Sequence, residues 1–219
     1  MNAPSNTKIL PLEHIQAGFD TLREVKQTFA QRGWFPATSG NLSLRLSADG
    51  ADPLLVITAS GKDKSVDTAE DFLVVDLQGK PAYPTHLKPS AETLLHTALY
   101  RRFPEVGAVF HIHTVANNLV SEWAAARGSV TFSKHELLKA LQRWEEDAEI
   151  HIPIVENHAN LPRLAQAMEA VIHPDVPAVL IRNHGVTVWG KSVFETKRHL
   201  EALEFLFEYQ VQRWMIERL

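Results

Sequence analysis

The chain has 219 residues, of which 45% are hydrophobic and 22% are charged, and its formal net charge is −4. This composition is ordinary for a globular protein, and the scattered Lys and Arg argue against a nucleic-acid partner or an anionic membrane partner. The absence of cysteine favours a reducing compartment. Because the N-terminus lacks the apolar core of a signal peptide and no apolar run reaches the roughly 20 residues that cross a bilayer, we expect a cytoplasmic protein.

The first part of the chain predicts a long helix followed by strands. Residues 1–8 are polar and are predicted to form a flexible tail, and a single domain is predicted over residues 9–219. Apolar residues recur at steps of three and four over residues 14–32, the pattern of an amphipathic helix. The segments "LSLRL", "LLVIT" and "DFLVVDL" are typical of strands, and turn residues separate them.

The second part predicts alternating helices and strands. A helix is predicted after Pro89, with Ser90 as its N-cap and Glu92 in its first turn. The segments "VGAVFHIHT", "AEIHIPIVE" and "PAVLIRNHGVTVWG" predict strands, and a long amphipathic helix is predicted over residues 193–218. Since several turns are too short for a parallel crossover, we expect one α/β domain with a mixed or largely antiparallel sheet covered by helices.

Two histidines one residue apart in "VFHIHT" suggest a metal site. On a strand, His111 and His113 point to the same face, roughly 6.5–7 Å apart at their Cα atoms, so both can reach one cation. A catalytic zinc ion normally takes three protein ligands and leaves a fourth position open. His184 in "RNHGV" is the most suggestive third ligand, because Gly185 lets another group approach closely. The spacing alone is also explained by two half-buried histidines that hydrogen-bond to their neighbours.

Five short segments, taken together in their order along the chain, favour the metal site over two hydrogen-bonded histidines. They are "TSGNLS", "ITASG", "KPSAE", "HIH" and "RNHGV". In this order and spacing they resemble the class II aldolase/adducin family over about residues 15–207. The resemblance implies an α/β/α sandwich around a central mixed, mainly antiparallel sheet, assembled as a homotetramer. By motif match it implies one Zn²⁺ per subunit, held by His111, His113 and His184.

The resemblance also implies a small-molecule sugar-phosphate substrate and a cradle for its phosphate. Gly, Asn and Ser are common in turns for other reasons, but the backbone N–H groups of such turns can also bind anions. The residues that match the cradle of the family are Ser39, Gly40, Asn41, Ser60, Gly61 and Ser90. The aldolases carry a second serine where this chain has Ala91, so Lys62 or Lys88 is expected to replace the missing hydroxyl.

Two glutamates compete for the proton-transfer role. Glu92 matches the acid/base of the aldolases, and Glu136 in "SKHE" matches a glutamate of a dehydratase branch of the family. Each also has a structural explanation, because Glu92 suits the first turn of a helix and Glu136 has the capping-box spacing from Ser133. The stretches "FSKHELLKAL", "IHIPIVEN" and "AVLIRNHGVTVWG" are most similar to the dehydratase branch. Glu136 is therefore predicted to be the principal acid/base, with Glu92 as a second group that lines the site.

The function expected from this resemblance is the zinc-dependent dehydration of a ketose phosphate. An aldolase or 4-epimerase of the same family is the alternative, since these enzymes share the metal ligands and the phosphate cradle. Only the position of the catalytic carboxylate separates the dehydratase from the aldolase. A non-catalytic scaffold like the adducin head is a remote alternative, and the complete set of three histidines argues against it.

Overall fold

The computed structural model describes residues 10–46 and 53–217, and the tail predicted over residues 1–8 lies outside the described residues. Within them, eight strands form one sheet in the order β3-β2-β1-β4-β8-β7-β6-β5. The strands are β1 (Asn41–Leu46), β2 (Leu54–Thr58), β3 (Phe72–Val75), β4 (Ala108–Ile112), β5 (Ser129–Ser133), β6 (Glu149–Val155), β7 (Ala178–Ile181) and β8 (Gly185–Gly190). All neighbouring strands are antiparallel except β6 and β7, which are parallel. The prediction of a mixed, mainly antiparallel sheet is confirmed.

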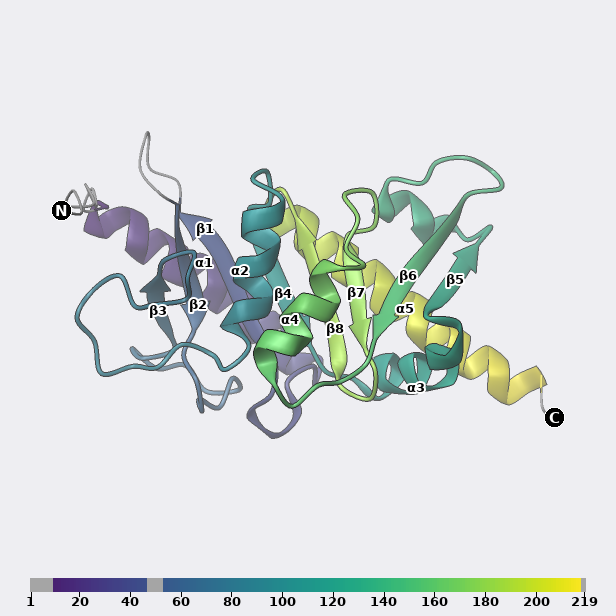
Figure 1. The fold of residues 1–219 in the computed structure, drawn as a ribbon, viewed down its shortest axis with the longest axis horizontal. Coiled ribbons are helices and arrows are strands. Elements are labelled where there is room, and N and C mark those ends of the chain that lie inside the picture. The colour runs from purple at the N-terminus through teal and green to yellow at the C-terminus, as the bar shows by residue number, and fades with distance from the viewer. Residues whose placement is uncertain (1–9, 47–52, 218–219) are drawn as a thin grey trace.

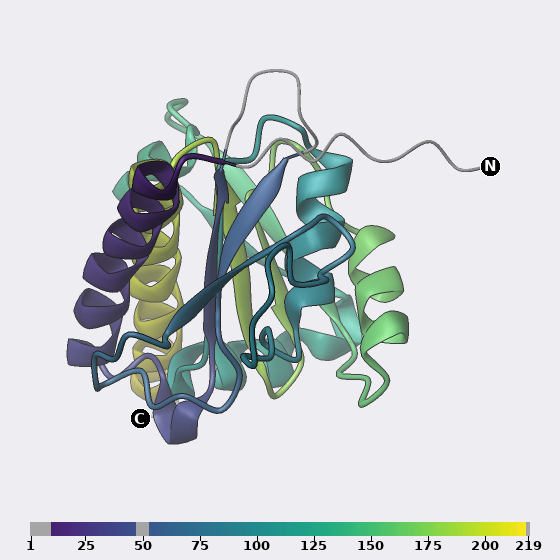
Figure 2. The ribbon, with the colours of Figure 1, turned by 90° about the vertical axis from the view of Figure 1, so that its left-hand side faces the viewer.

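Helices cover both faces of this sheet (Figures 1 and 2). They are α1 (Leu12–Gln31), α2 (Thr93–Arg102), α3 (Val115–Ala124), α4 (Leu161–Glu169) and α5 (Val193–Glu217), with three short 3₁₀ turns, η1 (Pro36–Thr38), η2 (Ala125–Arg127) and η3 (Glu136–Leu141). Helices α1, α3 and α5 pack on one face, and α2 and α4 pack on the other. The predicted α/β/α sandwich is thereby confirmed. No helix in the described ranges is long and apolar enough to span a membrane.

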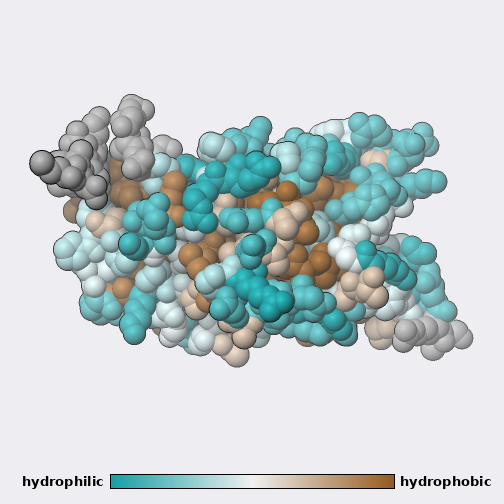
Figure 3. All heavy atoms as spheres, viewed as in Figure 1, coloured by the Kyte–Doolittle hydropathy of each residue, from teal (hydrophilic) through white to brown (hydrophobic). Residues whose placement is uncertain are grey.

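Alternation along the strands explains why the sheet has two apolar faces. Leu44 and Phe110 pack against the helices on the α1 side, whereas Leu55 and Val109 pack against α2 and α4. Successive side chains of a strand point to opposite faces, so a strand buried on both sides is apolar throughout. On the α2 and α4 side, apolar atoms show in patches among hydrophilic side chains (Figure 3). This is the surface expected of amphipathic helices that cover a sheet.

Two local predictions at helix starts are wrong. Helix α2 begins at Thr93 with Glu92 at its N-cap position, so Ser90 is not the N-cap. The reason is tertiary, because the backbone N–H of Ser90 donates to the Thr58 carbonyl at 3.1 Å and so holds this segment against the end of β2. The capping box offered as a structural explanation of Glu136 is also not found among the described residues, since the N-cap of η3 is His135, whose ring accepts from the Leu137 N–H.

Candidate metal centre and active site

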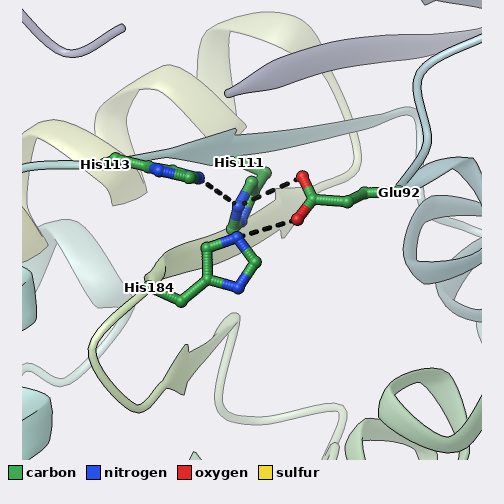
Figure 4. A group of neighbouring side chains, drawn as sticks. All are labelled: Glu92, His111, His113 and His184. Atoms are coloured by element: carbon green, nitrogen blue, oxygen red, sulfur yellow. Dashed lines mark hydrogen bonds and ion pairs between the residues drawn. The ribbon is translucent and has the colours of Figure 1, made fainter. Parts of the chain in front are cut away.

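Four side chains, here called the His/Glu cluster, converge where β4 ends and β8 begins: Glu92, His111, His113 and His184 (Figure 4). The Nε2 atoms of His111 and His113 are 2.8 Å apart. Glu92 Oε1 lies 2.8 Å from His184 Nε2, and Glu92 Oε2 lies 3.4 Å from His111 Nε2. One ligand atom from each of the four residues lies within 4.8 Å of the others. The structure therefore brings together the three histidines chosen from the sequence and one of the two glutamates.

The turn between β7 and β8, which carries His184, packs so closely against β4 that Gly185 has no space for a side chain. Asn183 adopts a left-handed conformation with φ of 50°, which turns the chain tightly before Gly185. A Cβ atom at Gly185 would collide with the carbonyl oxygen of Ile112 and would lie 2.8 Å from the His113 ring. Glycine is thus required for the close approach of this turn to β4. The close packing expected at Gly185 is present.

Residues behind the cluster orient its side chains. His111 pairs directly with Asn41 on β1 and with Thr187 on β8. Its Nδ1 atom lies 3.0 Å from Thr187 Oγ1, and an Nδ1–H that donates to this hydroxyl leaves Nε2 free for a metal. The Asn41 amide donates to Glu92 Oε2 at 2.6 Å, and its carbonyl oxygen contacts the buried His96 ring. Thr187 was missed because the strand register that places it here is not readable from the sequence. His96, on α2, was missed because its contact with Asn41 joins two segments that are far apart in the chain.

The electrostatics suit a cation. Burial lowers the pKa of His111 to about 4 and, with the neighbouring histidines, that of His113 to about 3. Burial pushes the pKa of Glu92 upward, but the interactions with His111 and His184 and the Asn41 hydrogen bond outweigh it and hold this pKa well below its usual range. Neutral imidazoles beside a carboxylate anion form the donor set of a zinc or similar divalent site. Unprotonated imidazole nitrogens this close repel one another unless both bind a cation.

The turns predicted to cradle a phosphate lie beside one another. Ser39, Gly40 and Asn41 precede and begin β1, Ser60 and Gly61 follow β2, and Ser90 precedes α2. The Ser60 N–H donates to the Lys88 carbonyl, which holds the second turn against the segment before α2. The Ser39 hydroxyl is buried without a hydrogen-bond partner among the described residues, as expected of a group that awaits a ligand.

The surroundings of the two lysines predicted to compensate for Ala91 do not favour that role. Lys62 is engaged elsewhere, since its Nζ atom pairs with Glu70 at 2.7 Å, and Lys88 is exposed. A third lysine, Lys64, was missed by the sequence reasoning. It is buried, and its Nζ atom donates to the Thr38 carbonyl at 2.7 Å. A lysine within a polar loop gives no sequence signal that distinguishes it from a solvated one.

Glu136 does not join the cluster of its own chain. Strands β4, β6 and β7 run in one direction and end on the side of the cluster, whereas β5 runs in the opposite direction. Glu136 follows the end of β5 and therefore lies at the other end of the sheet. Its side chain is 77% exposed and pairs with Lys139 at 2.9 Å. Within one chain, Glu92 is the carboxylate that faces the histidines.

An open cavity of about 450 Å³ borders the cluster on the α3 side. His113 and His184 line it, together with Pro36, Val115 and Leu119. Val115 and Leu119 stand one helical turn apart and are both exposed. The cavity therefore brings two side chains of the His/Glu cluster together with the apolar side chains of Val115 and Leu119, and Thr114, Asn118, Asn157 and Asn183 complete its lining.

Comparisons with known proteins point to one family. The family model described as the Class II Aldolase and Adducin N-terminal domain matches residues 20–211. The methylthioribulose-1-phosphate dehydratases of Geobacillus kaustophilus and Bacillus subtilis are 54% and 52% identical over 198 residues, which cover 90% of this chain and 92% and 93% of theirs.

Solved structures give the same fold. L-fuculose-1-phosphate aldolase from Thermus thermophilus superposes with a TM-score of 0.70 at 21% identity, covering 93% of this chain and 98% of that one. An aldolase II superfamily protein from Pseudomonas syringae gives a TM-score of 0.75 at 21% identity, over 95% of this chain and 79% of that one. With the family match over nearly the whole chain, these likenesses lead to one conclusion: the chain is a member of the class II aldolase/adducin family.

Proposed function

We propose that this protein is a zinc-dependent methylthioribulose-1-phosphate dehydratase of methionine salvage. It would convert 5-methylthioribulose 1-phosphate into 2,3-diketo-5-methylthiopentyl 1-phosphate and water. The observation that carries the proposal is the 54% identity, over 90% of the chain, to a relative that bears this enzyme name. The His/Glu cluster supports it, because the elimination needs an electrophilic cation beside a carboxylate.

His111, His113 and His184 would hold the metal, one ion per subunit. Three imidazoles suit zinc and leave a coordination position for substrate. When bound, zinc would supply Lewis-acid polarisation of the substrate's C2 carbonyl, which makes the neighbouring C3–H more acidic. Thr187 keeps the Nε2 atom of His111 available by accepting from its Nδ1–H.

In this proposal Glu92, rather than Glu136, moves the C3 proton. Its carboxylate stays ionised beside the histidines, so it can accept a proton from carbon. Asn41 holds one carboxylate oxygen at 2.6 Å, which fixes the direction of the other. Loss of the C4 hydroxyl then requires a proton donor, and the C3 proton and the C4 hydroxyl leave together as one water. Tautomerisation of the resulting enol gives the 2,3-diketone.

Glu136 can take part only from another copy of the chain, because it lies at the far end of its own sheet. We therefore assign it to the C4 hydroxyl of a neighbouring subunit's substrate, within the homotetramer that the family resemblance implies. In this scheme Glu92 acts at C3 within its own subunit, and Glu136 acts at C4 across an interface. A site that is completed by two chains is common in symmetric oligomers.

Mixing two inactive variants tests this assignment. Glu92→Gln and Glu136→Gln are each expected to keep the metal and lose dehydration. When the two are unfolded together and reassembled in equal amounts, about one quarter of the sites should combine an intact Glu92 with an intact neighbouring Glu136, and activity should return to about that fraction. An inactive mixture would refute the shared site. Near-wild-type turnover by Glu136→Gln alone would leave Glu92 as the sole acid/base.

The direct test is turnover of synthetic 5-methylthioribulose 1-phosphate by the zinc-loaded protein, with mass spectrometry to detect loss of one water. The alternative, a sugar-phosphate aldolase or 4-epimerase, is supported by the fold shared with L-fuculose-1-phosphate aldolase. An aldehyde product from fuculose or ribulose phosphates would favour it. The apolar wall of Val115 and Leu119 favours the thioether substrate. A purified protein that binds no metal would favour the adducin-like scaffold instead.

A further inference from the structure

Lys64 is a buried ammonium group without an acidic partner. Only 5% of the residue is exposed, and among the described residues it forms no ion pair with a carboxylate. Its Nζ atom donates to the carbonyls of Thr38 at 2.7 Å and of Lys62 at 3.5 Å. An ammonium group has three N–H donors, so one donor remains after these two contacts.

The second buried lysine shows how this fold normally accommodates such a charge. The Lys26 side chain is 1% exposed, and its Nζ atom forms ion pairs with Asp67 at 2.8 Å and with Asp71 at 2.6 Å. A buried charge is costly unless it is paired. Lys26 is paired within the protein and Lys64 is not, so the negative charge that balances Lys64 is expected to come from a ligand.

The position of Lys64 identifies the ligand class. Its two carbonyl partners belong to the two turns that match the phosphate cradle, the turn before β1 and the turn after β2. The unpartnered Ser39 hydroxyl belongs to the first of these turns. The Phe35 ring, 5.9 Å from Nζ, covers another side of the ammonium group. A cation that joins two such turns beside a free buried hydroxyl suits a phosphate group.

Lys64 also interacts electrostatically with the His/Glu cluster. Burial lowers the pKa of Lys64, and Glu92 is the strongest opposing influence on it. Lys64 in turn contributes to lowering the pKa of His113. The geometry agrees, because Lys64 donates to the Thr38 carbonyl and Asn41, three residues further along the same turn, donates to Glu92 at 2.6 Å. The ammonium group and the cluster therefore contact the same short segment, so that one small molecule can reach both.

We propose that Lys64 binds the phosphate of the substrate and so takes over the role of the hydroxyl that is missing at Ala91. The proposal rests on the proposed function for the identity of the whole substrate, but only a phosphate group is needed at Lys64. It also replaces the expectation that Lys62 or Lys88 fills this role. With the phosphate fixed here, C1 lies on the β1 side of the cluster and the methylthio end extends toward Val115 and Leu119.

The test compares Lys64→Met with Lys62→Met in the zinc-loaded enzyme. The two lysines are two residues apart, but only Lys64 is buried without a carboxylate. Lys64→Met is expected to raise the KM and the inhibition constant of inorganic phosphate about 10- to 100-fold, with a smaller change in kcat, because a charged hydrogen bond is lost. Lys62→Met is expected to change both constants less than twofold. The opposite ranking, or no change in Lys64→Met, would overturn the proposal.

Two further measurements distinguish a loss of phosphate binding from a loss of folding. Neither depends on the dehydratase assignment. Inorganic phosphate should raise the Tm of the wild type and of Lys62→Met but not that of Lys64→Met, and this needs no turnover. If Lys64→Met fails to fold, Lys64→Gln, which can still donate to Thr38, replaces it. In calorimetric titrations, inorganic phosphate should bind the wild type and Lys62→Met with similar affinity and Lys64→Met at least about tenfold more weakly. Equal phosphate affinities of Lys64→Met and the wild type would contradict the site, whether or not the dehydratase proposal holds.

Discussion

Replacing Thr187 with Val should weaken metal binding without changing the shape of the site. The Thr187 and His111 side chains are fully buried, and Oγ1 lies 3.0 Å from Nδ1. Val keeps nearly the same volume but offers no acceptor, and no water can easily replace it in a buried pair. The loss of a buried hydrogen bond costs about 1–3 kcal/mol. Since groups that orient metal-bound histidines typically contribute 10- to 100-fold in affinity, we expect the zinc dissociation constant to rise by about that factor, or about 1.4–2.8 kcal/mol.

A second threonine–histidine pair provides the control. Thr131 Oγ1 lies 2.8 Å from His151 Nδ1 on the exposed surface of β5 and β6. Thr131→Val removes the same kind of contact far from the cluster, so the zinc affinity should not change. Competition with a chelator of known affinity, followed by circular dichroism of both variants, measures the effect. An affinity of Thr187→Val within twofold of the wild type would refute the orienting role of Thr187.

Three further predictions follow from the site and its surroundings. His111→Ala should lose zinc and turnover with little change in circular dichroism, and stoichiometric zinc in the purified variant would contradict the metal assignment. Gly185→Ala should lower the free energy of unfolding by about 1–3 kcal/mol and weaken zinc binding, because its methyl group would collide with the Ile112 carbonyl; a wild-type Tm would argue against the collision. Burial raises the pKa of Glu204 from 4.5 to about 7, so its protonated form stabilises the fold below pH 4.5 and this contribution is lost as the pH rises through 7. Denaturant titrations should therefore show the unfolding free energy of the wild type, relative to Glu204→Gln, falling by about 3 kcal/mol over that window, and a constant difference would contradict the raised pKa.

The parts of the site that depend on local periodicity could be predicted from the sequence. His111 and His113 share a face because residues at i and i+2 of any strand do so. Gly185 made His184 the most suggestive third ligand, but the choice was fixed only by the family motif, since nothing local indicates that the turn between β7 and β8 meets β4. The periodicity of the helices and strands was likewise enough to predict one sheet covered by helices, whereas the two-layer arrangement of the helices was implied by the family resemblance.

What depends on distant contacts could not be predicted. The choice between Glu92 and Glu136 turns on the direction of β5, which its pairing with β6 decides. Ser90 has the right residue type for an N-cap, but its backbone is held by Thr58 and the helix starts later. In the sequence, Lys64 cannot be distinguished from a solvated loop lysine, because the two turns that bury it come together only in the fold.

The Asn118 side chain connects the two segments that supply the histidines. Its amide nitrogen donates to the His184 carbonyl and to the Thr114 carbonyl, both at 2.9 Å. Thr114 directly follows His113, so one amide group ties the end of β4 to the turn before β8. Because such contacts preorganise the ligands, zinc uptake has little chain entropy to overcome, in contrast to zinc fingers, whose folding requires the ion. Synthesis under metal starvation should therefore yield folded, inactive protein that gains activity as soon as zinc is supplied.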